Sequence, residues 1–302
     1  MPPTAFTSID LGHAYGKVAA LHSLDLDVPR GRIGLVGANG AGKSTLIKIL
    51  LGIIEQTTGT ATVLDMDNRR QTISIRSVVG YMPEGACLPL DQTAADFMVY
   101  SAGTAGLPGS AARQRASDVL TLVGLDEERF RYIGDFSTGM KQRTKLAQAI
   151  VHDPELVFLD EPTAGLDPSG REEMLDLIAR LGSFGIDVVV SSHVLRDIER
   201  TCDWVVRLDE GTLLYSGPIG SPDTEGAVRV ELNGSPTGFV QHLEAAHAEV
   251  TREGRRLSVS YGNGDVFDLI RDAATATDTS IRRLDDGASS LEELFLRRGS
   301  LR

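Results

Sequence analysis

The sequence predicts an α/β protein whose first and larger domain has a mostly parallel sheet, with a small α+β domain after it. Short apolar runs rich in β-forming residues occupy residues 33–36, 156–159 and 188–190. Runs that are apolar throughout are typical of strands buried on both faces of a parallel sheet. Segments with helical periodicity follow, at residues 43–51 and 171–181. Strands that alternate with helices predict an open-sheet α/β architecture.

A further helical segment is expected between the first and second of these strands, at residues 91–124. Residues 91–124 contain Ala-rich segments, interrupted at Leu107-Pro108-Gly109, where a proline cannot continue a helix. The alternating pattern ends near residue 220. We therefore assign residues 1–220 to the first domain.

The sequence changes in character after this point, and residues 221–302 are assigned to a second domain. Lysine is absent from it. Alternating apolar residues predict strands around 228–232 and 257–261, and helical patterns occur at 238–246 and 266–274. The order strand-helix-strand-strand-helix-strand predicts a ferredoxin-like α+β domain.

Composition excludes several classes of protein. Hydrophobic residues make up 41% of the 302 residues and charged residues 24%, which is typical of a globular domain. A formal charge of −12 disfavours non-specific binding to nucleic acid or to an anionic membrane, so no nucleic-acid partner is expected. The basic cluster Lys141, Arg143 and Lys145 is interpreted as a solvated helix face.

Other features point to the cytoplasm. Cys87 and Cys202 are too few for a disulfide framework, which indicates a reducing compartment. The first residues lack the pattern of a signal peptide. The most apolar stretch, residues 46–54, is much shorter than the ~20 residues that a membrane helix needs, so no membrane span is expected.

The strongest local motif is a phosphate-binding loop of the form G-x-x-x-x-G-K-[ST] at residues 37–44. It follows a predicted strand and begins a predicted helix, which is the context this motif requires. Backbone N–H groups of such a loop surround phosphates, and the helix N-terminus adds a favourable dipole. The loop and the first turn after it supply the predicted nucleotide contacts: Gly37, Asn39, Gly40, Ala41, Gly42, Lys43, Ser44 and Thr45.

A second motif supplies two carboxylates at the end of the strand 156–159. Asp160 is expected to hold Mg²⁺ through water, together with the hydroxyl of Ser44. Glu161 is expected to orient and deprotonate the water that attacks the γ-phosphate. Ligands of open α/β sheets bind at the carboxyl ends of the strands, where both residues lie.

The segments 136–143 (Phe-Ser-Thr-Gly-Met-Lys-Gln-Arg) and 160–168 (Asp-Glu-Pro-Thr-Ala-Gly-Leu-Asp-Pro) resemble the nucleotide-binding subunits of ATP-binding-cassette (ABC) transporters. The resemblance covers residues 6–220. It implies that Tyr15 stacks on adenine, that Glu84 occupies the Q-loop position as a further Mg²⁺ ligand, and that His193 is the switch histidine. It also implies that Asp167 belongs to the D-loop and that the signature motif comprises Ser137, Thr138, Gly139 and Met140.

The same resemblance implies a mechanism. Two such domains pair head to tail, and the signature motif of each contacts the ATP held by the other. We expect a homodimer that binds ATP and Mg²⁺, hydrolyses ATP with Glu161 and His193 as catalytic residues, and drives a separate membrane-spanning subunit. The chain would then lie peripherally on the cytoplasmic face of the cell membrane.

Two departures from the usual family pattern indicate a subgroup. Thr138 and Met140 stand where the common signature has glycine and glutamine, and Glu84 replaces the Q-loop glutamine. Both changes resemble the subunits that serve ABC-2 type exporters, including drug-efflux systems. Ser290 and Glu293 form a capping-box pattern for a last helix, and this closing segment resembles the small C-terminal accessory domain of those subunits.

Alternative functions explain less of the sequence. A P-loop kinase or GTPase would leave the signature motif and the switch histidine unexplained, and no N-K-x-D segment is present. A soluble ABC ATPase acting on the ribosome or on DNA would typically carry two cassettes or a long coiled coil, and the interval between Lys43 and Ser137 is too short for the latter. Import is a weaker variant of the transporter hypothesis, since the direction and the substrate of transport are determined mainly by the membrane partner.

Overall fold

The computed structural model describes residues 3–219, 227–233, 236–253, 256–261, 265–286 and 291. The chain divides into two compact units, Met1–Pro218 and Ile219–Arg302. Each unit has its own core of buried apolar side chains.

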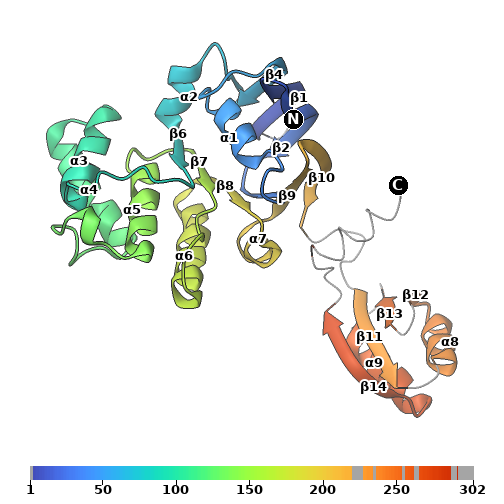
Figure 1. Cartoon of the computed structure of the whole chain (residues 1–302). Helices are drawn as coiled ribbons and strands as arrows, with labels where there is room; N and C mark the ends of the chain where they lie inside the picture. Colours follow the sequence, from blue (N-terminus) through green and yellow to red (C-terminus); the bar gives the residue numbers. More distant parts are fainter. Residues whose placement is uncertain are drawn as a thin grey trace. The chain divides into compact units, whose positions relative to one another are not determined.

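The first unit is built on a six-stranded sheet with the order β10-β9-β3-β8-β7-β6 (Figure 1). Pairing is parallel from β6 to β9, and β10 joins β9 antiparallel. Every residue of β7 is buried, as its continuous apolar sequence predicts. The strands are β3 (Arg32–Val36), β6 (Val79–Met82), β7 (Leu156–Asp160), β8 (Asp187–Ser192), β9 (Trp204–Asp209) and β10 (Thr212–Pro218).

A second, antiparallel sheet with the order β2-β1-β4-β5 was not predicted. Its strands are β1 (Thr4–Tyr15), β2 (Val18–Pro29), β4 (Thr58–Val63) and β5 (Met66–Asp67). Its apolar face shares one core with α1 and with the six-stranded sheet, and the rings of Phe6 and Phe158 lie 6.3 Å apart across it. The hairpin that joins β1 and β2 thereby becomes a neighbour of the loop between β3 and α1.

Helices connect the strands and form a separate helical region at one end of the unit (Figure 1). Among the described residues, none of the helices combines the length and the apolar composition that a membrane span requires. The helices of this unit are α1 (Lys43–Leu50), α2 (Thr72–Val78), α3 (Ala94–Thr104), α4 (Gly109–Leu122), α5 (Thr138–Ile150), α6 (Pro168–Leu181) and α7 (Leu195–Thr201), with short 3-10 turns at Ile133–Asp135 and Gly182–Phe184.

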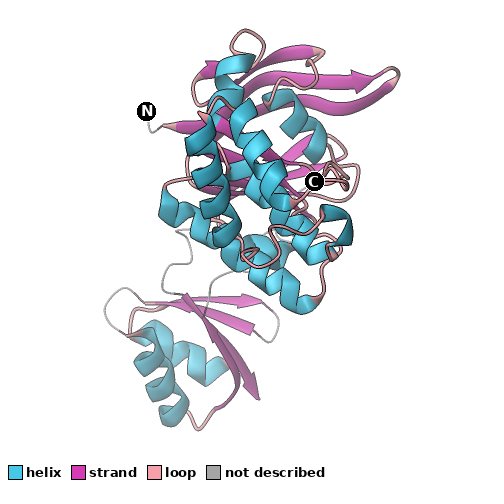
Figure 2. Ribbon diagram, turned by 90° about the vertical axis from the view of Figure 1, so that its left-hand side faces the viewer, coloured by secondary structure: helices cyan, strands magenta, loops and turns pink. Residues whose placement is uncertain are grey.

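The second unit has a four-stranded antiparallel sheet with the order β12-β13-β11-β14. This order, with the alternation of strands and helices, is the split βαβ arrangement of ferredoxin-like domains. Both helices pack on one face of the sheet (Figure 2), where Phe239 and Ile270 are buried against Val230 and Val259. The elements are β11 (Ala227–Asn233), α8 (Thr237–Ala245), β12 (Glu249–Glu253), β13 (Arg256–Ser260), α9 (Val266–Ala276) and β14 (Ser280–Asp286).

The last helix expected from Ser290 lies outside the described residues, apart from Leu291, which is buried. Its role in the second unit therefore stays a prediction.

A fragment that ends at Pro218 should fold without the second unit, because the two hydrophobic cores contain separate sets of residues. We expect its far-ultraviolet circular dichroism to show native helix and its thermal unfolding to remain cooperative. Calorimetry of the full chain is the control, since it should contain one transition that the fragment lacks. An unfolded fragment would contradict the division into two units.

A candidate nucleotide site at the carboxyl ends of three parallel strands

The loop between β3 and α1 has the backbone that a phosphate-binding loop requires. Gly40 and Gly42 have φ values of 86° and 100°, in the left-handed region that favours glycine. A Cβ on Gly42 would also lie 2.8 Å from the carbonyl oxygen of Ala20 on β2. A Cβ on Gly37 would lie 2.5 Å from the carbonyl oxygen of Leu208 on β9. Neighbouring strands thus fix the loop tightly, and its glycines are a steric necessity.

Lys43 begins α1 and turns back into the loop. Its side chain is 6% exposed, and its Nζ donates to the carbonyl oxygens of Gly37 at 2.8 Å and Ala38 at 3.2 Å. The same Nζ lies 3.5 Å from Oε1 of Glu161 at the end of β7. An ammonium group is therefore held at the centre of the loop, where a nucleotide's phosphates would enter.

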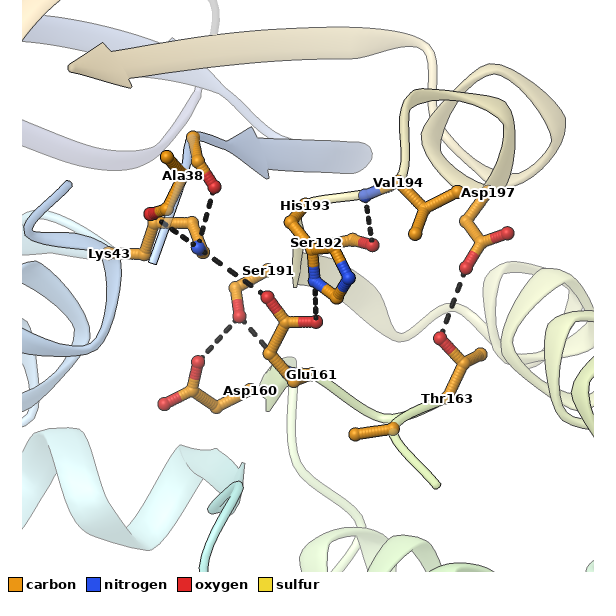
Figure 3. A network of polar contacts seen from close by, with 12 residues as sticks. Ala38, Lys43, Asp160, Glu161, Thr163, Ser191, Ser192, His193, Val194 and Asp197 are labelled. Carbon is orange, nitrogen blue, oxygen red and sulfur yellow. Dashed lines mark hydrogen bonds and ion pairs between the residues drawn. The ribbon is translucent and has the colours of Figure 1, made fainter. Parts of the chain in front are cut away.

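Asp160 and Glu161 are fixed by Ser191 on the neighbouring strand β8 (Figure 3). The Ser191 hydroxyl donates to Oδ1 of Asp160 at 2.5 Å and accepts from the Glu161 N–H at 3.0 Å. Glu161 has a φ of 48°, which is uncommon for a residue with a side chain. Backbone strain of this kind is concentrated at functional sites, and here it directs the Glu161 carboxylate toward Lys43.

His193 follows β8 and is the third side chain of the site, beside Lys43 and Glu161. Its Nδ1 donates to Oε2 of Glu161 at 3.0 Å, while its side chain remains 55% exposed. Oε1 of Glu161 is buried and makes no hydrogen bond, although it lies within ion-pair distance of Lys43. Glu161 therefore has one oxygen oriented by His193 and one that can accept a proton from a bound water.

The signature residues lie elsewhere, at the N-terminus of α5. Ser137 caps this helix by accepting from the Met140 N–H at 3.3 Å, while Ser137 and Thr138 are exposed. Asp167 caps α6 in the same way, by accepting from the Gly170 N–H at 3.1 Å. These two helix ends line a cavity of about 600 Å³ together with Gly139 and Glu173. One chain by itself brings no signature residue to Lys43.

Glu84 and Lys145 meet at the loop after β6. The Glu84 side chain is exposed, and no hydrogen bond or ion pair among the described residues joins its carboxylate to Ser44 or Asp160. Lys145, which was predicted to be a solvated residue, is 6% exposed. Its Nζ donates to the carbonyl oxygens of Pro83 at 2.9 Å and Glu84 at 2.8 Å.

That prediction was wrong because helix α5 packs against the loop after β6 on the side that carries Lys145. Burial lowers the pKa of Lys145, and nearby negative groups that include Glu84 and Asp160 counteract the shift. Burial also raises the pKa of Tyr81 to about 12, with Asp160 contributing. Lys141 and Arg143 are held as well: Lys141 donates to the Gly134 carbonyl, and Arg143 forms an ion pair with Glu173.

Tyr15 lies at the end of β1 and is 49% exposed, with its ring edge-to-face against His13 at 4.6 Å. The other strand of this hairpin carries Ala20, which contacts the loop at Gly42. Tyr15 is thus on an element fixed beside the phosphate loop, with its ring accessible for stacking.

Sequence reasoning missed several polar residues that join the motifs. Gln142 on α5 is buried and donates to the Ala164 carbonyl in the loop after Glu161, at 3.0 Å. Asp197 on α7 accepts from Thr163 in the same loop and from Arg171 on α6. The signals that could have found them are weak, because each contact joins residues more than 20 positions apart.

A glycine-lined loop with a central lysine, beside a strand end with two carboxylates, defines a P-loop nucleoside triphosphatase. The sequence profile of the family described as "ABC transporter" matches residues 21–164. Relatives that are at least 30% identical, and of which this chain covers more than two thirds, are also ABC transporter ATP-binding proteins. The chain therefore belongs to this family, as an ATP-binding and ATP-hydrolysing protein. The predicted family, fold class and ATPase activity are confirmed.

Two relatives and one solved structure illustrate the family. An uncharacterised ABC transporter ATP-binding protein of Nostoc is 40% identical over 67% of this chain and 61% of its own length. The daunorubicin/doxorubicin resistance ATP-binding protein DrrA of Streptomyces peucetius is 30% identical over 98% of this chain and 92% of its own. The structure of cbiO1 from Clostridium perfringens, part of the ABC transporter complex cbiONQ, is 25% identical with a TM-score of 0.64, over 72% of this chain and 89% of its own.

The substitution Gly42→Ala should destabilise the protein more than Gly40→Ala, which is its matched control. Both glycines have positive φ, but only at Gly42 would a Cβ meet backbone. We expect about 1 kcal/mol lost for Gly40→Ala from backbone strain, and on the order of 3 kcal/mol for Gly42→Ala, where a steric clash is added. Urea denaturation measures both. Equal losses would contradict the close approach of Ala20.

Proposed function

We propose that this chain is the ATP-hydrolysing subunit of an ABC-2 type exporter, and that the buried Glu161 carboxylate between Lys43 and His193 is its catalytic centre. The close approach of these three side chains carries the proposal. Glu161 and His193 directly follow β7 and β8, and Lys43 begins the helix after β3. These are three adjacent strands of one sheet. Such a site is rigid, which favours a fixed geometry for the attacking water.

The phosphates of ATP would occupy the loop 37–44. Phosphate oxygens are stronger acceptors than the backbone carbonyls to which Lys43 now donates, so the Lys43 ammonium would move to them. Glu161 would then take the proton of the attacking water on Oε1, while His193 keeps Oε2 oriented and contacts the γ-phosphate from its exposed side. Tyr15 would stack on the adenine ring.

The donor set fits a magnesium ion shared with the nucleotide. Mg²⁺ prefers oxygen ligands and usually keeps waters and substrate phosphates in its shell. Ser44 supplies a hydroxyl on the first turn of α1, and Asp160 supplies a carboxylate held by Ser191. Glu84 would be a further oxygen ligand once its exposed side chain turns toward the ion. The bound ion would offset part of the negative charge of the phosphates.

Completion of the site requires a second chain. The N-terminus of α5 presents the Ser137 hydroxyl and the Gly139 N–H, which suit an anionic phosphate. Because these groups lie away from Lys43 in the same chain, a head-to-tail homodimer would place them on the γ-phosphate held by the partner. Asp167, whose helix end lines the same cavity, would then lie at the interface between the two sites.

Export would depend on a separate membrane-spanning subunit, to which this chain binds on the cytoplasmic face of the membrane. The cbiO1 protein is part of a transporter complex, and the Streptomyces relative is named for resistance to two drugs. Resistance of this kind is what drug export would confer. Thr138 and Glu84, which depart from the common family pattern in the way that ABC-2 type subunits do, also support export. The second unit would be its accessory domain, acting on dimer stability or regulation.

The substitution Glu161→Gln should abolish ATP turnover and preserve ATP binding, because it removes the proton acceptor and leaves the loop intact. We expect kcat to fall by at least ~10²-fold, the range that general-base catalysis supplies. Lys43→Ala is the contrasting variant and should weaken nucleotide binding itself. Phosphate release and equilibrium binding of labelled ATP measure the two effects. Turnover by Glu161→Gln at the rate of the unmodified chain would exclude Glu161 as the base.

A tagged full-length chain should retain a multi-span membrane protein when native membranes are solubilised gently and the chain is purified. We expect this partner in stoichiometric amount by mass spectrometry, and its loss after a high-salt or detergent step that dissociates the complex. Purification from the soluble fraction is the control. Ribosomal or DNA-repair proteins in place of a membrane partner would contradict the exporter proposal and favour a non-transport ABC ATPase.

A further inference from the structure

Asp197 is a buried carboxylate to which no role in ATP hydrolysis has been given so far. It lies in the first turn of α7 and is 3% exposed. Its Oδ1 accepts from Nε of Arg171 at 2.9 Å and from Nη2 of the same residue at 2.7 Å. Its Oδ2 accepts from the Thr163 hydroxyl at 3.0 Å. Both oxygens are thus engaged, which is the condition for keeping a charge buried.

The partners of Asp197 show what it holds together. Arg171 is on α6, so its contact joins α6 to α7. Thr163 lies two positions after Glu161, whereas Asp197 lies four positions after His193. The Thr163–Asp197 hydrogen bond therefore joins the segment that carries Glu161 to the segment that carries His193 (Figure 3).

A second link joins the same two segments on the other side of this pair. The Glu161 N–H donates to the Ser191 hydroxyl at 3.0 Å and to the Ser191 carbonyl at 3.2 Å. The Glu161–His193 hydrogen bond therefore has a fixed contact on each side. The contact with Ser191 precedes it in both segments or lies at its start, and the Thr163–Asp197 bond follows it in both segments. His193 is exposed and has no strand pairing of its own, so its position depends on the Glu161–Ser191 and Thr163–Asp197 contacts.

The same loop is attached to the signature helix. The Ala164 carbonyl, one position after Thr163, accepts from Gln142 on α5 at 3.0 Å. A displacement of α5 would therefore be transmitted to Thr163 through one peptide unit. Contacts of this kind, between packed elements with fixed hydrogen bonds, are what carry coupling between sites.

We propose that Asp197 is a positioning residue for ATP hydrolysis: through Thr163 it holds the Glu161–His193 pair in its reactive geometry and links that pair to the signature helix. The inference rests on the proposed roles of Glu161 and His193. Asp197 does not touch the reacting atoms, and its bond to Arg171 alone would be a structural link between two helices.

The substitution Thr163→Val separates the two roles, because it removes the hydroxyl and leaves the Arg171–Asp197 ion pair in place. We expect kcat for ATP to fall about tenfold with KM unchanged, since small displacements of catalytic groups cost rate steeply. Thr163→Ser should restore kcat. In the full-length chain, the imidazole nitrogen signals of His193 in heteronuclear NMR, assigned with His193→Gln, should move toward those of a free imidazole.

Thr201→Val is the matched control. It also removes a buried hydroxyl near Asp197, but that hydroxyl donates to the Asp197 backbone carbonyl within α7. We expect it to change neither kcat nor the His193 signals, and thermal unfolding should show that both variants remain folded.

Two further outcomes are distinguishable. Unchanged kcat and unchanged His193 signals in Thr163→Val, with Glu161→Gln inactive, would overturn the role of Asp197 and leave the proposed function intact. Normal turnover in Glu161→Gln would overturn the proposed function and this inference with it.

Discussion

The contacts of the buried Glu161 carboxylate determine how Lys43 and His193 are placed in this site. Glu161 is 5% exposed, and its two oxygens face Lys43 on one side and His193 on the other. A buried charge left without its partner typically costs about 3–5 kcal/mol. The parallel pairing of β3, β8 and β7 brings the three residues to one edge of the sheet. Register errors of one residue would separate them, so the site and the sheet depend on each other.

Helix α5 is the second organising element, because its side chains reach two different loops and its N-terminal end is exposed. Ser137 at its N-terminus is exposed, Gln142 bonds to the loop after Glu161, and Lys145 bonds to the loop that carries Glu84. A helix transmits displacement along its length as a rigid body. Ser137, which would contact a nucleotide held by a partner chain, is thus joined through one helix to both loops that surround the chain's own site.

The sequence predicted what depends on local pattern. The loop 37–44, the strand before Asp160 and the α+β pattern after residue 220 each have a signature within about ten residues. The antiparallel sheet of β1, β2, β4 and β5 was missed, because its strands alternate irregularly and β1 is bulged against both neighbours. The burial of Lys145 and the Thr163–Asp197 bond were missed for a different reason. Each is decided by packing between elements far apart in the sequence, which no local spacing encodes.

The burial of Lys145 also bears on the presence of Glu84 at a position where the family usually has glutamine. A carboxylate in place of an amide adds negative charge beside Asp160 and Glu161, and Lys43 is already engaged with Glu161. Lys145 places an ammonium group close to this charge, since its Nζ lies 2.8 Å from the Glu84 carbonyl oxygen. Its bonds to the Pro83 and Glu84 carbonyls fix the backbone of the loop and leave the Glu84 carboxylate exposed. Lys145 therefore holds the backbone of this loop and places an ammonium group near the negative charge that a glutamine would not add.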